Sequence, residues 1–362
     1  MASVEEYFMM KNPIGSRRLF LTALLATLLA FPAVSLAGEM KSSTANYPGG
    51  GEGPLRVQFF VFMADIEDID EATQTFNVNM YVRLWWQDKH LTQSGTSERI
   101  LPLDSIWNPR IVVANQRGFI RKSLPETVRV SPDGTVTYDQ HYVFKAIQLL
   151  KLSDFPMDQH RFTVQFVATG YTTHELVFVP GIVKSERELT GGGISSELSL
   201  PDWDIVGYES RARPYEPIPE VKAAGFAFEF KAKRRFPFYF WQVIVPLAVI
   251  VAMSWAAFWI DPSLAASQIG VATSSILSMI AYRFVLSNLL PRLPYMTRLD
   301  YFTVGSTLLV LLALVIVTWT SVLGKKGLGK RAQRIDHWAR GLFPVVFIAQ
   351  FIWFLFGSPI GS

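Results

Sequence analysis

The sequence contains no cysteine, and this absence excludes disulfide bonds, thiolate chemistry and cysteine-ligated metals. Histidine is scarce as well, and the five residues show no metal-ligand spacing: His90, His141, His160, His174 and His337. The chain also lacks a phosphate-binding loop and a serine nucleophile motif. We therefore expect no enzymatic activity, no metal site and no cofactor.

Charged residues make up only 18% of the chain, whereas half of the residues are hydrophobic and 14% are aromatic. The apolar residues concentrate after about Phe238, and the basic runs adjoin these apolar segments. That arrangement is typical of membrane topology rather than of nucleic-acid binding. We expect a membrane domain that follows a separate N-terminal domain, and no nucleic-acid partner.

The N-terminal residues have the composition of a targeting segment. Arg17 and Arg18 precede an apolar stretch that ends at Ala30, and small residues follow at the spacing of a cleavage site. This pattern predicts a secretory signal peptide over residues 1–37 and a flexible leader over 38–54. An uncleaved membrane anchor is the alternative, although the apolar stretch is short for a bilayer span.

Residues 55–235 carry the pattern of β-strands. Apolar and polar side chains alternate in residues 75–84, 161–167 and 227–233, and a period of two gives one buried and one solvated face. Turn signals separate the runs, as in residues 131–134, where proline fixes φ and glycine accepts a positive φ. Many short strands with such turns predict an antiparallel, immunoglobulin-like β-sandwich.

Residues 236–362 contain four apolar segments, each near the ~20 residues that a helix needs to cross a bilayer. We expect the helices at about 238–260, 264–286, 299–323 and 338–356. An even number of spans places the C-terminus on the same side as the sandwich. The linker between the third and fourth segments is then cytoplasmic, and its basic residues follow the positive-inside rule: Lys325, Lys326, Lys330, Arg331 and Arg334.

The second apolar segment is unusual because it is rich in hydroxyl side chains. Residues at alternating steps of three and four share one helical face: Ser267, Gly270, Ser274, Leu277, Ala281, Phe284 and Asn288. A ring of such helices could enclose water, with a constriction at Leu277 and Phe284 that gates by dewetting. Packing between helices also favours small and hydroxyl residues, so the stripe alone leaves both interpretations open.

Six short motifs follow one another along the chain: Trp86-Gln87-Asp88, Trp107-Asn108-Pro109, Phe155-Pro156-Met157-Asp158, Pro246 with residues 254–259, residues 290–295, and residues 343–347. Together they resemble the Cys-loop receptor family, and in particular its prokaryotic members, which lack the cysteines around the Phe-Pro-x-Asp loop. The resemblance covers the chain from about Leu55 to Phe356.

The resemblance implies a homopentameric, ligand-gated or pH-gated ion channel of the bacterial inner membrane, with the second helix lining the pore. The implied partners are identical subunits, the lipid bilayer, permeating ions, and a small-molecule, proton or hydroxide agonist. The sandwich and the C-terminus would be extracytoplasmic. A non-conducting, membrane-anchored sensor is the alternative.

The resemblance also implies a site that couples the sandwich to the membrane helices. In this family, an arginine before the first helix pairs with the Phe-Pro-x-Asp carboxylate and with an acid in a strand-connecting loop. These positions fall on Arg235, on Asp158, and on Glu71 or Asp70, and a guanidinium shared by two carboxylates is strong where water is excluded. The alternative is an exposed ion pair worth at most about 1 kcal/mol. The other implied members of the coupling site are Phe155, Pro156, Pro291 and Pro294.

The agonist site of this family lies between subunits and is built from aromatic loops. The matching positions here are Tyr81 on the complementary side and Tyr171, Tyr215 and Phe226 on the principal side, and Asn115 is a further candidate. Ala114 and Thr169 replace rings that receptors for quaternary amines carry, so we do not expect a full cation–π cage. A place for Tyr171 and Phe226 in the sandwich core is the alternative.

Two features of the second helix remain open. Its cytoplasmic end, residues 265–268, has no charge, so the sequence does not decide between cation and anion selectivity. Arg283 lies one step off the polar stripe, and we expect it to face a neighbouring helix and extend toward the outer interface. A direct role of Arg283 in conduction is the alternative.

Overall fold

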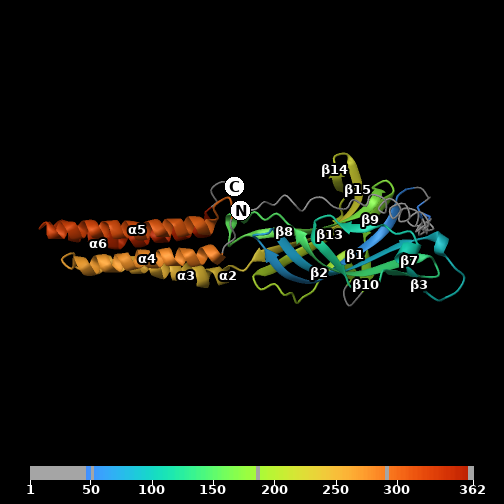
Figure 1. The fold of residues 1–362 in the computed structure, drawn as a ribbon, viewed down its shortest axis with the longest axis horizontal. Coiled ribbons are helices and arrows are strands. Elements are labelled where there is room, and N and C mark those ends of the chain that lie inside the picture. Colours follow the sequence, from blue (N-terminus) through green and yellow to red (C-terminus); the bar gives the residue numbers. More distant parts are fainter. Residues whose placement is uncertain (1–45, 50–52, 185–187, 290–292, 358–362) are drawn as a thin grey trace, which may run out of the picture. The chain divides into compact units, whose positions relative to one another are not determined.

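The computed structural model describes residues 46–49, 53–184, 188–289 and 293–357. The predicted signal peptide and most of the predicted leader lie outside these residues. Strands extend from Leu55 to Arg234, and helices follow from Phe236 to Phe356. Figure 1 shows this order, with the strands blue to yellow-green and the helices yellow to red.

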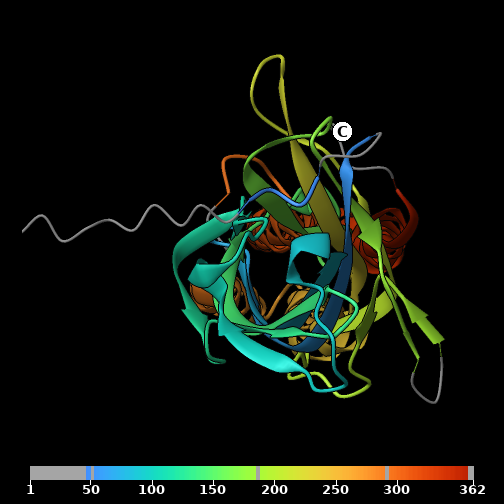
Figure 2. The ribbon, with the colours of Figure 1, turned by 90° about the vertical axis from the view of Figure 1, so that its right-hand side faces the viewer.

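The strands are β1 (Leu55–Asp70), β2 (Thr75–Gln87), β3 (Arg99–Pro102), β4 (Ile111–Val113), β5 (Gln116–Lys122), β6 (Thr127–Val130), β7 (Thr135–Ile147), β8 (Gln159–Thr172), β9 (Leu176–Pro180), β10 (Ile182–Lys184), β11 (Glu188–Thr190), β12 (Gly192–Ile194), β13 (Trp203–Ala212), β14 (Tyr215–Ile218) and β15 (Val221–Arg234). One sheet has the order β12-β1-β2-β7-β6-β3, with β5 beside β7 and β9 beside β1. The other has the order β13-β15-β8-β4, with β14 beside β15. Figure 2 shows the two sheets curving around a common interior.

The interior of the sandwich is built by the predicted alternation of apolar residues. In β2, every second side chain from Phe76 to Trp86 is at most 2% exposed. Rings from three strands meet in the centre, where the Phe59 ring lies 4.5 Å from Phe226 and 4.9 Å from Phe166. Each fully buried apolar side chain of this size contributes about 1.5–3 kcal/mol to folding.

The antiparallel sandwich is confirmed, but two pairings on the outer edge of β1 are parallel. β9 pairs with residues 55–59 and β12 with residues 61–63. Gly192 allows the second pairing, because a Cβ atom at this residue would lie 2.5 Å from the Val61 carbonyl oxygen. Backbone segments that approach so closely require glycine.

The predicted turn at residues 131–134 joins β6 to β7. Gly134 has φ of 83°, and its N–H donates to the Ser131 carbonyl oxygen at 2.9 Å. A side chain at Gly134 would also collide with the Asp88 carbonyl oxygen, which lies 2.4 Å from the position of a Cβ atom.

The helices are α2 (Phe236–Tyr239), a π-helical turn (Phe240–Ile244), α3 (Val245–Ala256), a 3-10 turn (Ala257–Trp259), α4 (Ala265–Leu289), α5 (Arg298–Lys325) and α6 (Gly329–Phe356). The segment from α2 to the 3-10 turn forms one span, so the described residues contain four helices that are long and apolar enough to cross a membrane. In Figure 1, α3, α4, α5 and α6 run alongside one another.

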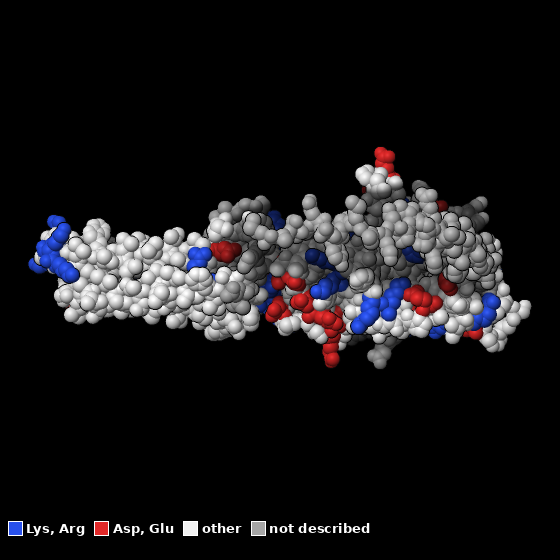
Figure 3. Space-filling view, viewed as in Figure 1, with Lys and Arg blue, Asp and Glu red and all other residues white. Residues whose placement is uncertain are grey.

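The fourth helix begins at Gly329, whereas the apolar pattern predicts about Trp338. Ala332 and Asp336 are buried in the added turns, while Lys330 and Arg331 are exposed. A helix continues past its apolar run where one face still packs on its neighbours. Figure 3 shows Lys and Arg gathered at the end of the bundle where α5 gives way to α6, and a nearly uncharged surface between that end and the strands.

Candidate functional site

A buried arginine at the end of β15 holds together the strands and the first helix. The Arg234 Nε and Nη2 atoms donate to the two carboxylate oxygens of Asp158 at 2.8 and 3.2 Å. Its Nη1 donates to Glu71 Oε1 at 2.8 Å and to the Tyr239 hydroxyl at 3.2 Å. The side chains of Arg234 and Asp158 are only 1% and 2% exposed, so this guanidinium fork lies away from water, where such contacts are strong.

The predicted arginine of this network was Arg235, and that prediction is wrong. Arg235 is half-exposed, and it donates to Asp204 Oδ1 at 2.7 Å and to the Pro201 carbonyl oxygen at 2.9 Å. Consecutive residues of a strand point to opposite faces, and Arg234 shares the inward face with Phe230 and Ala232, both of which are buried. The period of β15 was therefore the signal that could have identified it.

The acid in the strand-connecting loop is Glu71 and not Asp70. The Asp70 carboxylate instead accepts the N–H groups of Ala72 and Thr73 and closes the turn between β1 and β2. Such a local hydrogen-bond pattern is a common use of aspartate in turns.

Aromatic rings and a histidine complete the surroundings of Arg234 and Asp158. The Arg234 guanidinium lies 4.1 Å from the Trp203 ring centre and 4.7 Å from that of Phe155. His160 Nε2 lies 2.7 Å from Asp158 Oδ2. Burial opposes ionisation of Asp158, but the hydrogen bonds from His160 and Arg234 and the guanidinium charge hold the pKa of this carboxyl below its ordinary value.

A second contact joins the Phe-Pro-x-Asp loop to the segment between α4 and α5. The Tyr295 hydroxyl accepts the N–H of Leu152 at 2.9 Å, and Arg298 Nε lies 2.8 Å from Asp154 Oδ1. Pro156 is buried in this loop, whereas Pro294 is exposed beside Tyr295. Pro291 lies outside the described residues.

One face of α4 is free in the single chain. The described members of the predicted stripe are all exposed, with Leu277 and Phe284 at 67% and 68%: Ser267, Gly270, Ser274, Leu277, Ala281 and Phe284. The side chain of Asn288 is not among those that the structure describes. The opposite face packs on the other helices through Gln268, Ala272, Ser275, Met279 and Leu286.

The predicted agonist residues divide into exposed and buried ones. Tyr81 is 48% exposed, stacks on His141 with ring centres 4.4 Å apart, and lines a cavity of about 380 Å³. Tyr215 is half-buried on β14. Tyr171 is also half-buried, and its hydroxyl accepts the Trp107 Nε1 hydrogen at 2.8 Å.

Phe226 has no exposed surface and belongs to the core, so its predicted place in the agonist site is wrong. Asn115 is occupied by backbone groups: its Nδ2 donates to the carbonyl oxygens of Ile147 and Thr163, and its Oδ1 accepts from Gln165. The Asn115 side chain therefore positions strands rather than presenting free polar atoms.

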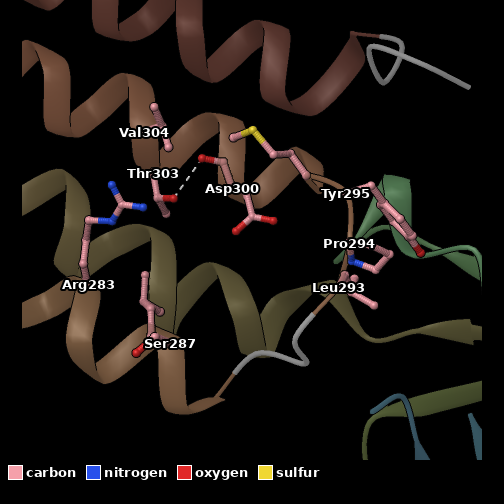
Figure 4. Close-up of a pocket in the computed structure, with 10 residues that line it drawn as sticks. Arg283, Ser287, Leu293, Pro294, Tyr295, Asp300, Thr303 and Val304 are labelled. Atoms are coloured by element: carbon pink, nitrogen blue, oxygen red, sulfur yellow. Dashed lines mark hydrogen bonds between the residues drawn. The ribbon is translucent and has the colours of Figure 1, made fainter. Parts of the chain in front are cut away.

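Arg283 lines a cavity of about 440 Å³ between α4 and α5. Figure 4 shows its side chain directed into the same space as Asp300 and Thr303 of α5, with Tyr295 at the far end. The Asp300 carboxylate is held by the backbone and hydroxyl of Thr297 in a capping box at the start of α5. Arg283 is exposed in the single chain, and the cavity that it lines with residues of α5 agrees with the expectation that it faces a neighbouring helix.

Comparisons with known proteins give an independent assignment. The profile of the neurotransmitter-gated ion-channel ligand binding domain matches residues 43–236. The chain is 25% identical to the gamma-aminobutyric acid receptor subunit beta-4 of Gallus gallus over 306 residues, which cover 80% of this chain and 60% of that protein. It is 24% identical to a proton-gated ion channel of Gloeobacter violaceus over 306 residues, which cover 83% of this chain and 82% of that protein.

These matches and the structure agree on the architecture. The matched profile spans the sandwich, and four apolar helices follow it, so the chain is a multi-pass membrane protein. It belongs to the neurotransmitter-gated ion-channel family.

Proposed function

We propose that five copies of this chain form a ligand-gated or pH-gated ion channel, with α4 of each copy lining a central pore. The observation that carries the proposal is the exposed stripe of small, hydroxyl and apolar residues on α4, whose opposite face is buried. A helix that faced lipid would gain nothing from exposed Ser267 and Ser274, whereas a water-filled pore solvates them. Leu277 and Phe284 would form the narrow apolar part that dewets in the closed state.

The proposed location is the inner membrane of a bacterium, with the sandwich and the C-terminus outside the cytoplasm. The exposed basic residues at the end of α5, in the short connection that follows and at the start of α6 support this orientation through the positive-inside rule. The relative from Gloeobacter violaceus, which is described as proton-gated, supports the bacterial branch of the family.

The coupling role of the Arg234 network is part of the proposal. Arg234 ends β15, and the Tyr239 hydroxyl that it contacts lies on the first helix, while Glu71 belongs to the turn after β1. A movement of the sandwich would thus reach the first helix through one buried guanidinium. The contact of Tyr295 with Leu152 offers a second path, toward the end of α4.

The agonist would bind between subunits, with Tyr81 on one side and Tyr171 and Tyr215 on the other. The exposure of Tyr81 and the half-burial of the other two rings support this choice. The agonist is proposed to be a proton, a hydroxide or a small molecule.

Electrical recording from cells that express the chain tests the proposal. External pH is stepped in both directions, and small amines and aromatic acids are then added. We expect a current whose reversal potential follows the sodium or the chloride gradient, which also settles the selectivity. A silent protein at the cell surface under all these conditions would instead favour a non-conducting sensor with the same fold.

A further inference from the structure

A buried polar cluster joins α4, α5 and α6 at the end of the bundle that bears the basic residues. Gln268 Nε2 donates to Asp336 Oδ2 at 3.1 Å, and the Ser321 hydroxyl donates to Gln268 Oε1 at 3.1 Å. Gln268 Nε2 also lies 3.3 Å from the Ile260 carbonyl oxygen. Asp336 and Gln268 are fully buried, and Ser321 is 2% exposed.

The hydrogen bonds of Asp336 are incomplete. Its Oδ1 atom is buried and has no hydrogen-bond partner among the described residues. An ionised carboxylate can accept about four hydrogen bonds, whereas Asp336 accepts one from Gln268 and has the Thr320 hydroxyl as its other nearby polar partner. An unpaired ionised carboxylate is costly in a dry interior, and such a group usually holds a proton instead.

Among the charged groups on the surrounding elements, Arg340 is close enough to favour the ionised form of Asp336, but none of them donates a hydrogen bond to it in the described residues. On α6, the Arg340 guanidinium donates to the Phe258 carbonyl oxygen and lies over the Trp259 ring, while Arg334 and His337 are exposed. Asp261, on the connection before α4, accepts the N–H of Ser263. Lys325, at the end of α5, is exposed.

Asp336 lies close to the end of its helix. It lies seven residues after Gly329, the first residue of α6, and at 1.5 Å per residue this is about 10 Å from the helix end. Its partner Gln268 belongs to the first turn of α4, next to Ser267 of the exposed stripe. A change in the protonation of Asp336 would therefore alter its hydrogen bond to the first turn of the proposed pore helix.

We propose that Asp336 is a proton-binding site, at which the neutral acid holds α6 against the start of α4 and loss of the proton loosens this contact. The inference extends the proposed function to regulation by pH from the side of the basic linker. Its tests measure unfolding and protonation of the purified protein and need no electrical recording. Its failure and the failure of the channel assignment are therefore distinguishable.

The first test uses the purified full chain and measures thermal unfolding at pH 6 and pH 9. We expect the wild-type midpoint to fall at pH 9 by about 3 °C or more beyond the change seen in Asp336→Asn, which keeps the shape but has no proton to lose. Asp261→Asn is the matched control, because it removes an exposed carboxyl near the same end of the bundle, and it should retain the wild-type difference. An equal fall in Asp336→Asn and wild type overturns the proposal.

The second test does not depend on the folding of a variant. Infrared spectroscopy of the wild-type protein should show the carbonyl band of a protonated carboxylic acid at pH 6, where exposed carboxyls are ionised, and the band should weaken as pH rises. Where Asp336→Asn folds, it should lack this band. The absence of the band from the wild-type protein at pH 6 overturns the proposal.

Discussion

At the scale of single residues, a few buried charged side chains each contact several partners. Arg234 alone contacts Asp158, Glu71 and Tyr239, which come from three different segments. Glu229 shows a related arrangement, since Arg161, Arg211 and Arg213 all surround its buried carboxylate. Burial opposes ionisation of Glu229, yet these guanidinium groups hold the pKa of its carboxyl below the ordinary value.

Replacement of Arg234 should lower the stability of the protein far more than replacement of Arg235. We expect Arg234→Ala to lower the free energy of unfolding by about 3 kcal/mol or more, because it leaves the buried Asp158 carboxylate without its main partner. Arg235→Ala removes only an exposed pair, worth at most about 1 kcal/mol. Chemical denaturation of the two purified variants checks this, and equal losses would contradict the assignment of Arg234.

A milder variant separates coupling from folding. Arg234→Lys keeps the charge but cannot form the fork with Asp158. We expect it to assemble and to lose most of the agonist-evoked current, whereas Arg235→Lys retains it. Unchanged gating in Arg234→Lys, with normal surface expression, would remove the coupling role.

The stability of the sandwich should fall in acid. The pKa of Asp158 is lower in the folded chain than the ordinary value of about 3.9. The contribution of ionised Asp158 to the free energy of unfolding is therefore fully present above that ordinary value. It is lost as pH falls through the lower, folded-state pKa. Denaturation between pH 3 and pH 7 should show a steeper loss in the wild type than in Asp158→Asn, and parallel curves would contradict the argument.

At the scale of elements, the two faces of α4 differ in burial. One face carries exposed small, hydroxyl and apolar residues, and the other is buried against α3 and α5. The buried face is itself partly polar, with Gln268 and Ser275. Burial therefore distinguishes the two faces of α4, whereas hydroxyl content alone does not.

The absence of native cysteine permits a direct test of this division. Cysteine introduced at Ser274 or Ala281 should react rapidly with a water-soluble methanethiosulfonate and block current. Cysteine at Ala272 or Met279, which are buried on the opposite face, should react slowly. Reaction at all four positions at similar rates would contradict a pore lined by the exposed stripe.

The aromatic residues of the sandwich should likewise separate into core and ligand-facing groups. Phe226→Ala should cost about 3–5 kcal/mol of unfolding free energy, because it empties the centre of the core. Tyr81→Ala should change stability by about 0.5 kcal/mol or less, while it shifts the agonist response. Thermal or chemical denaturation of both variants, followed by recording of Tyr81→Ala, measures these effects.

At the scale of the whole molecule, the proposed pentamer would enclose the exposed stripe of α4. The family consists of ligand-gated channels and not of enzymes, which confirms the expectation drawn from the missing catalytic motifs. A single copy leaves Leu277 and Phe284 two-thirds exposed, and a ring of copies would direct them toward a shared axis.

Native mass spectrometry of the detergent-solubilised chain should therefore give five times the mass of one subunit. The same count is expected in Arg235→Ala, which lies outside the buried network. A monomer or a dimer under conditions that preserve the fold would contradict the pentamer and favour a membrane-anchored sensor.

Periodicity and motif order predicted many of the secondary-structure elements of this protein. The alternation in β2, the turn at Gly134 and the four apolar runs predicted their elements, because local pattern and backbone preference act over a few residues. The family resemblance, by contrast, placed the buried arginine of the Asp158 network one residue too late. The apolar pattern failed for the start of α6, because a helix with one buried face continues beyond its apolar run.

The sequence by itself determined the sandwich, the four spans and the stripe of α4, since each depends on residues close together in the chain. Only the tertiary structure decided which acid Arg234 meets, that Phe226 is core, and that Asp336 of α6 contacts Gln268 of α4. The hydrogen bonds of Asp336 with Gln268 and of Arg234 with Glu71 join residues 68 and 163 positions apart, and no local pattern encodes such a distance. Burial and hydrogen bonding in the folded chain select among partners that the sequence leaves equivalent.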